Sequence, residues 1–470
     1  LVHCHFKAFD NVTDINSNLS HTFTAKVSSV RELALCCTVF CNLLYLISSS
    51  FAYVTIKDRI PIILTKVIDV VGLEDLKSIN HHLSELRYRL TTDKPLLDVS
   101  GYRKDVSIWN QHLKDYELQH GTENTWFRCP WLLAECYMYR KIVEAFDLSV
   151  MMKQFDPFQF QKEESFIGCL EKMAASATYL KKWEDTKEQK SNNDTLDENI
   201  FNAFLQISLW GNKFDLSISA GAIIHHVSPL DHAQELHPFI LCDDSSKIYE
   251  KIRSEKFSNR RLDIILDNAG LELFGDLCLA EYFLKAHLVQ EVHFHVKSMP
   301  WFVSDVTHDD FTWTLEMLRC NESPILKHYG RLWSERVEKN QFRVMQNDFW
   351  TYSSPYRDMK SVAPSLYNDL TKSDLLIFKG DLNYRKLAAD LKWPFSTSFR
   401  EALDGFEPAP LVALRTLKAD VVVGISDEIS TEAASKDKNW MINGNYAVIQ
   451  YLEPMSTSLD DRYFRRRPLS

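Results

Sequence analysis

The sequence LDIILDNAGLE, residues 262–272, is the stretch that decides the fold. It opens with the apolar run Ile264–Leu266, which is too short to form a helix. Apolar residues then recur at spacings of three and four from Leu273 to Leu288. This order predicts a buried parallel strand, a tight turn, and a helix that packs back onto the sheet.

The predicted turn carries two adjacent oxygen-bearing side chains, Asp267 and Asn268. In open α/β sheets, ligands bind at the carboxyl ends of the strands. A carboxylate beside an amide oxygen suits a hard divalent cation such as Mg²⁺ or Mn²⁺, and the N–H groups that open the helix suit a phosphate. Asp, Asn and Gly are also the usual turn residues, so this stretch alone is better explained as a turn with an N-cap.

Length and composition are those of a globular chain. The chain has 470 residues, and single cores stop growing at roughly 250–300 residues, so two main domains are expected. The net charge is −10 and no long basic run interrupts it, which makes nucleic acid a poor candidate partner. The ten cysteines form no pair of C-x-x-C units. Most have apolar neighbours, which predicts buried thiols in a reducing, intracellular compartment, either cytoplasmic or nuclear.

The two ends of the chain differ from the rest. Residues 1–50 are predicted to be an atypical N-terminal extension that is not part of the fold. Their apolar run, residues 33–47, is shorter than the ~20 residues that a membrane helix needs, so no membrane association is expected, and a membrane anchor is the less favoured alternative. Residues 456–470 form a basic segment that is expected to be a solvated tail.

Two patterns divide the remaining chain. Residues 51–215 show helical periodicity and few β-branched runs, which predicts an all-helical domain. Over residues 216–455, short apolar runs alternate with helical stretches, which predicts a mostly parallel sheet with helices on both faces. The expected strands are residues 264–266, 292–296, 375–378, 421–425 and 447–449.

A second carboxylate follows the second expected strand. Asp305 comes shortly after residues 291–297, much as Asp267 follows its own strand. If the two strand ends are neighbours, Asp267, Asn268 and Asp305 form a three-ligand oxygen site, with water or phosphate in the other positions of the cation. Taken alone, Asp305 is equally compatible with a turn or an N-cap.

Two basic segments also fall beside expected strands. The loop KGDLNYRK, residues 379–386, predicts a phosphate cradle in which Gly380 allows close backbone approach and Asn383 caps the next helix. It is not a Walker A loop. The segment RTLK carries Arg415 and Lys418, which could clamp a phosphoryl group. Taken alone, the first segment fits an ordinary helix cap and the second a charged segment that precedes a strand. Together with the carboxylates, the two segments indicate metal-assisted phosphoryl chemistry.

One further polar group interrupts a helical pattern. Asn212 lies in the sequence WGNKFD, residues 210–215. It is either part of a helix C-cap or a polar group that a loop presents to a ligand.

These motifs resemble those of the metal-dependent damage-control phosphatases, in the branch also called acidic residue methyltransferases. The Arg-Thr-x-Lys element marks this branch, and the resemblance extends in order over roughly residues 51–453. The matching segments are FAYVTIKDRIP (51–61), PWLLAECYMYR (130–140), SLWGNK (208–213), LDNAGLE (266–272), PWFVSD (300–305), FKGDLNYRKL (378–387) and RTLK (415–418).

The resemblance implies a helical N-terminal domain on a Rossmann-like three-layer α/β/α domain. It implies a divalent metal held by Asp267, Asn268 and Asp305. The metal is Mn²⁺, Co²⁺ or Ni²⁺, and Mg²⁺ is a further candidate. The implied substrates are sugar phosphates, fructose phosphates among them. The substrate phosphate contacts that it implies are Asp381, Asn383, Arg385 and Lys418. Further predicted substrate-binding residues are Asp267, Asn268, Glu272, Leu382 and Tyr384, with Lys379, Arg415 and Asn212 in support. The chain has Asn-Ala-Gly where the family pattern is Asn-Ser-Gly, which removes a hydroxyl but no metal ligand.

The sequence thus predicts a metal-dependent phosphatase acting on small phosphorylated metabolites, with the attacking group either a water on the metal or Asp267 itself. One alternative is a carboxyl methyltransferase that uses S-adenosylmethionine, although the glycine-rich loop usual in methyltransferases is missing after residues 262–266. The other alternative is a non-catalytic binding protein on the same fold. The oligomeric state is left open.

Overall fold

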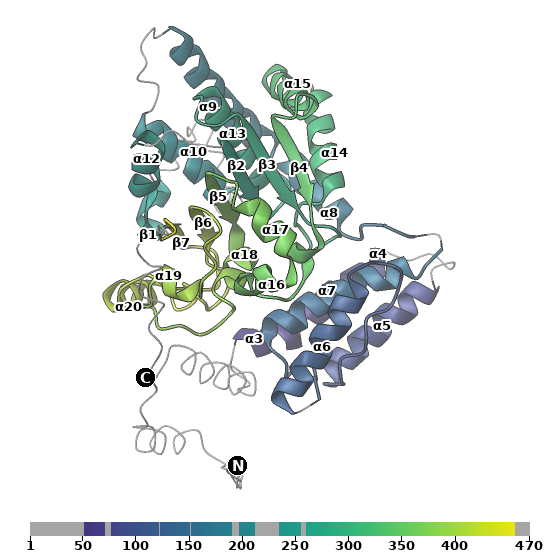
Figure 1. Cartoon of the computed structure of the whole chain (residues 1–470). Coiled ribbons are helices and arrows are strands. Elements are labelled where there is room, and N and C mark those ends of the chain that lie inside the picture. The colour runs from purple at the N-terminus through teal and green to yellow at the C-terminus, as the bar shows by residue number, and fades with distance from the viewer. Residues whose placement is uncertain are drawn as a thin grey trace.

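The computed structural model describes residues 51–70, 77–121, 123–150, 152–189, 197–211, 235–254 and 260–455. Within these ranges the chain forms a helical bundle and a larger unit built around a seven-stranded sheet (Figure 1). The predicted extension 1–50, the apolar run within it, the tail 456–470 and Asn212 lie outside the described residues. No helix in the described ranges combines the length and the apolar character that a membrane crossing requires.

The bundle is built from amphipathic helices that bury one stripe each. Its helices are α3 (Phe51–Val54), the π-helix η1 (Thr55–Arg59), α4 (Ile60–Val70), α5 (Lys77–Thr91), α6 (Val106–His120) and α7 (Trp131–Asp147). In α5 the buried residues Ile79, Leu83, Leu86 and Leu90 follow the helical spacing that the sequence indicates. Helix α7 begins after Pro130 and is buried along most of its length, so it forms the centre of the bundle.

The next helices pack on the sheet rather than on the bundle. They are α8 (Gln159–Gly168), α9 (Leu170–Gln189) and α10 (Glu198–Trp210). Helices α9 and α10 contact α13 (Leu271–Lys285), which is buried on all sides. The packing therefore changes near residue 158, whereas the sequence suggests a helical domain that extends to residue 215. Helical periodicity marks an apolar face but does not specify its partner.

The sheet has the strand order β1-β7-β6-β5-β2-β3-β4. The strands are β1 (Ile240–Asp243), β2 (Arg261–Ile265), β3 (Glu291–Val296), β4 (Phe342–Gln346), β5 (Leu375–Lys379), β6 (Leu411–Thr416) and β7 (Ala447–Leu452). Strands β2 to β6 are parallel, β7 is antiparallel to β6, and β1 is parallel to β7. The mostly parallel sheet that the sequence predicts is therefore confirmed.

Alternate residues of the strands enter two separate cores, one on each face of the sheet. In β2, Ile264 packs in the core shared with α9, α10 and α13, whereas Ile265 packs in the opposite core. The first face also carries α14 (His308–Arg319) and α15 (Pro324–Glu338). Short helices contribute to the opposite core, η4 (Asp348–Thr351), η5 (Tyr356–Asp358), α16 (Met359–Val362), α17 (Pro364–Leu370), α18 (Gly380–Leu387), α19 (Phe399–Ala402) and α20 (Asp427–Lys436). This arrangement confirms the three-layer α/β/α fold (Figure 1). The remaining helices are η3 (His237–Phe239) and α12 (Ser245–Ser254).

One predicted strand is wrong. Residues 421–425 are buried except for Gly424 but form no strand, and the strand in this region is β6, which precedes them. Side chains bond the Val423 backbone, since its N–H donates to Tyr384 Oη at 3.2 Å and its carbonyl accepts from Gln450 Nε2 at 2.7 Å. The Gly424 and Ile425 N–H groups donate to the Thr397 and Phe395 carbonyls at 2.8 Å and 3.0 Å. Gly424 has φ +73°, which interrupts an extended chain.

Candidate functional site

The predicted metal ligands meet at the carboxyl edge of the sheet. Strand β2 pairs with β3, and Asn268 beyond β2 forms an antiparallel bridge with Asp305 beyond β3. The Val306 N–H donates to the Asp267 carbonyl at 2.8 Å, and the Ala269 N–H donates to the Ser304 carbonyl at 2.8 Å. The two loops therefore hold each other, and the three residues that the sequence proposes as ligands are brought together.

A third loop closes on Asp267 from β5. Gly380 begins α18 with φ +82°, and a Cβ placed there would lie 1.9 Å from Asp267 Oδ2 and 2.7 Å from Asp267 Cβ. No side chain fits between the two residues. The close backbone approach that the sequence predicts for Gly380 is present, and its neighbour is the candidate metal ligand.

The carboxylates of Asp267, Glu272 and Asp305 are all buried. Burial raises the pKa of Asp267 well above its usual range, and the nearby Asp305 and Glu272 raise it further. Burial also raises the pKa of Asp305, and Lys297 acts against this rise. Lys297 Nζ lies 3.1 Å from Asp305 Oδ2 without hydrogen-bond geometry, and it donates to the Leu266 carbonyl at 2.8 Å.

The Asn268 amide occupies the space between the acids. Its Nδ2 donates to Asp267 Oδ2 at 2.6 Å and to Glu272 Oε2 at 2.9 Å, while its Oδ1 accepts from Ser304 Oγ. Two buried carboxylates and an amide form a donor set that suits a hard divalent cation. The described residues contain no group of three His, Cys, Asp or Glu side chains placed to hold a metal, so this set depends on Asn268 for its third ligand.

Glu272 is held by a buried lysine. Lys379 is fully buried, and its Nζ lies 2.8 Å from Asp276 Oδ1 and 3.3 Å from Glu272 Oε1. It also donates to Ser208 Oγ at 2.9 Å. Its charge is therefore committed to two acids of α13 rather than open to a ligand.

Arg415 is likewise occupied. Its Nε donates to Asp381 Oδ1 at 2.8 Å, and its guanidinium lies 4.2 Å from the Tyr384 ring centroid. The Lys418 N–H donates to the same Asp381 oxygen at 3.0 Å. The Lys418 side chain is exposed, and its Nζ makes no hydrogen bond or ion pair within the described ranges. Among the predicted phosphate-binding cations that lie there, Lys418 is the one whose charge is open to a ligand.

Asn383 does not cap a helix. Helix α18 already begins at Gly380 after the N-cap residue Lys379, because glycine accepts the left-handed backbone there. Asn383 lies inside the helix, where its Nδ2 donates to the Lys379 carbonyl at 2.7 Å and its Oδ1 accepts from Tyr356 Oη. It ties α18 to the end of β5.

The other residues of this helix join it to its surroundings. Arg385 Nε donates to Asp390 Oδ1 at 2.8 Å, and its NH1 group donates to Glu135 Oε2 at 2.7 Å. Leu382 packs in the bundle core, and Tyr384 Oη donates to Gln450 Oε1 at 2.8 Å. The motif that is predicted to be a phosphate cradle therefore also joins the helical bundle to the α/β unit.

Several residues near the site were not identified from the sequence. Lys297, at the end of an apolar strand, was a detectable signal because a lysine in such a run needs a buried partner. Ser304 and Lys386 gave no such signal. Lys386 is fully buried, donates to the Trp350 carbonyl at 2.8 Å, and has a pKa lowered to about 8 by burial.

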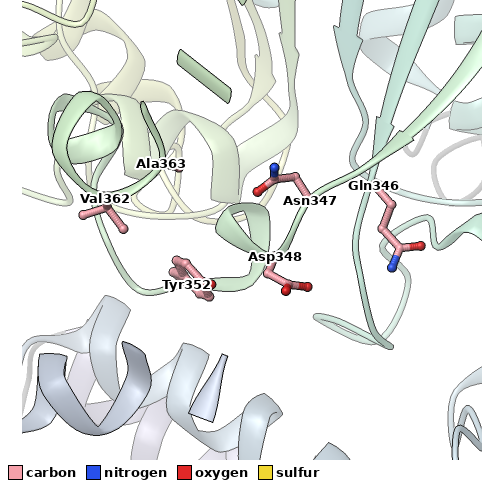
Figure 2. A pocket seen from close by; sticks show the side chains of 6 residues that line it. All are labelled: Gln346, Asn347, Asp348, Tyr352, Val362 and Ala363. Atoms are coloured by element: carbon pink, nitrogen blue, oxygen red, sulfur yellow. The ribbon is translucent and has the colours of Figure 1, made fainter. Parts of the chain in front are cut away.

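A surface pocket of about 400 Å³ lies at the carboxyl end of β4 (Figure 2). It is lined by Gln346, Asn347, Asp348, Tyr352, Val362 and Ala363. None of the predicted site residues lines it, so it does not enter the candidate chemistry.

The chain is similar to known proteins over most of its length. The family model described as the damage-control phosphatase ARMT1-like domain matches residues 55–433. Damage-control phosphatase ARMT1 of Xenopus tropicalis is 41% identical over 443 residues, which cover 89% of this chain and 99% of that protein. The protein of the same name from Homo sapiens is 41% identical over 429 residues, covering 86% of this chain and 97% of that protein.

A solved structure of a DUF89 family protein from Pyrococcus horikoshii is 16% identical, with a TM-score of 0.39, and covers 84% of this chain and 96% of that one. The family match spans every predicted site residue, and the similarity to the curated relatives covers most of both chains. This chain therefore belongs to the ARMT1-like family of damage-control phosphatases.

Proposed function

We propose that this protein is a phosphatase that depends on a divalent metal and hydrolyses phosphomonoesters of small metabolites, with sugar phosphates such as fructose phosphates as substrates. The observation that carries the proposal is the convergence of Asp267, Asn268 and Asp305 at one buried sheet edge. Family membership supports phosphatase chemistry, and the metal and the substrate are our assignment.

Asp267, Asn268 and Asp305 would hold Mn²⁺, Co²⁺, Ni²⁺ or Mg²⁺. A bound cation supplies Lewis-acid polarisation of a phosphoryl oxygen and lowers the pKa of a bound water. Binding would also neutralise carboxylates whose pKa is raised by burial, which is why this donor set fits the cation.

The chain's own groups account for substrate binding. Lys418 is exposed near Asp381 and offers an ammonium to the phosphate. The first N–H groups of α18, which follow Gly380, are donors that lack intrahelical partners and suit an anion. Arg415 fixes Asp381, and through it the backbone of Lys418, so its role is to hold this loop in place.

Glu272 completes the polar wall of the site. Lys379 and the Asn268 amide fix its two oxygens, one each, at 3.3 Å and 2.9 Å. A carboxylate held in this way is suited to accept a hydrogen bond from a substrate hydroxyl or from a water. Lys297 beside Asp305 favours the ionised carboxylate that a metal ligand must be.

The test is a phosphatase screen over sugar phosphates with Mg²⁺, Mn²⁺, Co²⁺ and Ni²⁺, followed by the variants Asp267→Ala and Asp305→Asn. Both are expected to lower kcat/KM by about 10²-fold or more, because Asp267→Ala removes a metal ligand and Asp305→Asn replaces a charged ligand with a neutral one. Asp309→Asn is the matched control, since its side chain is 99% exposed and lies four residues from Asp305. Unchanged activity in Asp267→Ala with Mn²⁺ present would refute the proposal.

A further inference from the structure

Helix α7 presents one face to the candidate site. Trp131, Glu135 and Tyr139 are spaced by four residues and therefore share a side of the helix. The Arg385 guanidinium lies 3.6 Å from the Trp131 ring centroid and is paired with Glu135. Tyr139, one turn further on, contacts a different segment, the turn Trp301–Val303 that leads to Asp305.

This turn has an unfavourable backbone. Phe302 has φ +43° and Val303 has φ +71°, so two consecutive residues other than glycine adopt the left-handed region. The conformation is costly for any residue with a Cβ, and most of all for β-branched valine. Such a turn persists only where the surrounding contacts hold it.

The contacts that hold the turn come from the bundle. The Tyr139 and Phe302 rings are stacked with centroids 4.5 Å apart, and the Tyr139 and Trp301 centroids are 5.9 Å apart. Trp301 is fully buried in the bundle core, with Phe302 and Val303 packed against that core. A segment of the α/β unit is therefore seated in the hydrophobic core of the bundle.

The turn determines where the next residues lie. The Asp305 N–H donates to the Trp301 carbonyl at 3.1 Å, and the Ser304 N–H donates to the Phe302 carbonyl at 2.9 Å. Ser304 Oγ then donates to Asn268 Oδ1. If residues 302 and 303 relaxed to ordinary φ values, the chain would leave the turn in another direction and these bonds would be lost.

The far side of the loop is anchored separately. Thr307 and Asp310 form a capping box at the start of α14, and Lys162 Nζ lies 2.6 Å from Asp310 Oδ2. The chain after Asp305 is therefore fixed by polar contacts from α8. The chain before Asp305 is held by the bond from the Ala269 N–H to the Ser304 carbonyl and by the aromatic stack, in which Tyr139 is the ring supplied from outside the loop.

We infer that Tyr139 is a positioning residue of the candidate metal site: its ring holds the Trp301–Val303 turn in the left-handed conformation and so sets Ser304 and Asp305 against Asn268. The effect of Tyr139 on metal binding and catalysis rests on the proposed function, whereas its effect on the conformation of the turn does not. The bundle thereby contributes to the geometry of a site whose ligands all belong to the α/β unit.

The experiment compares Tyr139→Leu and Tyr139→Phe in the full chain. The first removes the ring and the second keeps it. Tyr137→Leu is the matched control, because Tyr137 lies on the same helix, is 2% exposed, and bonds to the backbone of Leu97 instead of contacting the turn. Phe302→Leu removes the other ring of the stack and replaces Tyr139→Leu if that variant does not fold.

The first measurement is hydrogen exchange of the amides of residues 304–306 without metal. Tyr139→Leu is expected to accelerate exchange by about tenfold or more, because losing the stack opens the turn locally. Tyr139→Phe and Tyr137→Leu are expected to remain near the wild-type rate. Exchange in Tyr139→Leu within about twofold of Tyr137→Leu would overturn the inference.

The second measurement is Mn²⁺ affinity by calorimetry. Tyr139→Leu is expected to bind Mn²⁺ about tenfold more weakly than Tyr137→Leu, as for other residues that orient a ligand. Faster exchange with unchanged Mn²⁺ affinity would also overturn the inference. Asp267→Ala, made in the otherwise wild-type chain, tests the proposed function separately. If this variant binds Mn²⁺ as tightly as the wild type, the proposed metal site is wrong, and the exchange data alone decide the role of Tyr139.

Discussion

Gly380→Ala offers a sharp test of the site, because its two effects can be separated. The first effect is on the backbone. Gly380 has φ +82°, and a residue with a Cβ pays about 1–2 kcal/mol to adopt the left-handed region. This cost lowers the free energy of unfolding and does not concern the chemistry.

The second effect is a collision with the candidate metal ligand. The added Cβ would lie 1.9 Å from Asp267 Oδ2, 2.2 Å from its Cγ and 2.7 Å from its Cβ. Rotation of the carboxylate alone does not remove these overlaps, because the Asp267 Cβ is also too close. The Asp267 side chain must withdraw by more than about 1 Å, and a misplacement of that size costs about 10²-fold in rate.

The assay measures kcat/KM with Mn²⁺ and the free energy of unfolding in urea. Gly405→Ala is the control, because Gly405 has φ +86° but no atom within 4 Å of its added Cβ. Gly405→Ala is expected to lose the backbone contribution to stability alone and keep its activity, whereas Gly380→Ala is expected to lose at least as much stability and about 10²-fold in kcat/KM. If the two variants have equal activity, Asp267 is not placed by this contact and the reasoning is refuted.

Three further outcomes are expected. Lys418→Ala should raise KM for the phosphorylated substrate by about tenfold or more and leave Tm unchanged, because the Lys418 ammonium is exposed and unpaired within the described ranges. An unchanged KM would show that Lys418 does not bind the phosphate. Arg385→Ala should lower the free energy of unfolding by about 3–5 kcal/mol, since it removes a buried guanidinium that pairs with the two largely buried carboxylates of Glu135 and Asp390, and urea denaturation measures this. Burial raises the pKa of Asp267 in the folded state, so its contribution to stability is present at low pH and is lost as pH rises through the folded pKa. Asp267→Asn should therefore stabilise the metal-free protein at pH 8 but not at pH 4, and urea titrations that give the same difference at both pH values would contradict this.

The sequence was informative wherever a local pattern has one structural solution. An apolar run, a turn with glycine and a helical stripe describe the unit from β2 to α13 without any knowledge of the rest. Because parallel strands end at the same edge of a sheet, Asp267 and Asp305 could be placed together from their positions after two strands. Gly380 could be assigned a close approach because glycine is the residue that allows one.

The sequence was misleading where several structures satisfy the same pattern. Residues 421–425 have the composition of a strand, but their backbone is bonded by separate parts of the chain, with Tyr384 and Gln450 side chains on Val423 and the Thr397 and Phe395 carbonyls on Gly424 and Ile425. Asn383 resembles a cap, but Gly380 starts the helix earlier. The helices after residue 158 have the same periodicity as those of the bundle, and only the folded structure shows that two of them, α9 and α10, cover the buried helix α13.

Taken by itself, the sequence determined the order of the elements, the sheet edge that carries the acids, and the family. Only the tertiary structure decided which charges remain open to a ligand, because ion pairs are made by residues that are distant along the chain. Lys379 and Arg385 look like phosphate-binding cations until Asp276 and Glu135 are seen beside them. The physical reason is that periodicity and turn chemistry are short-range, whereas the pairing of buried charges depends on the complete fold.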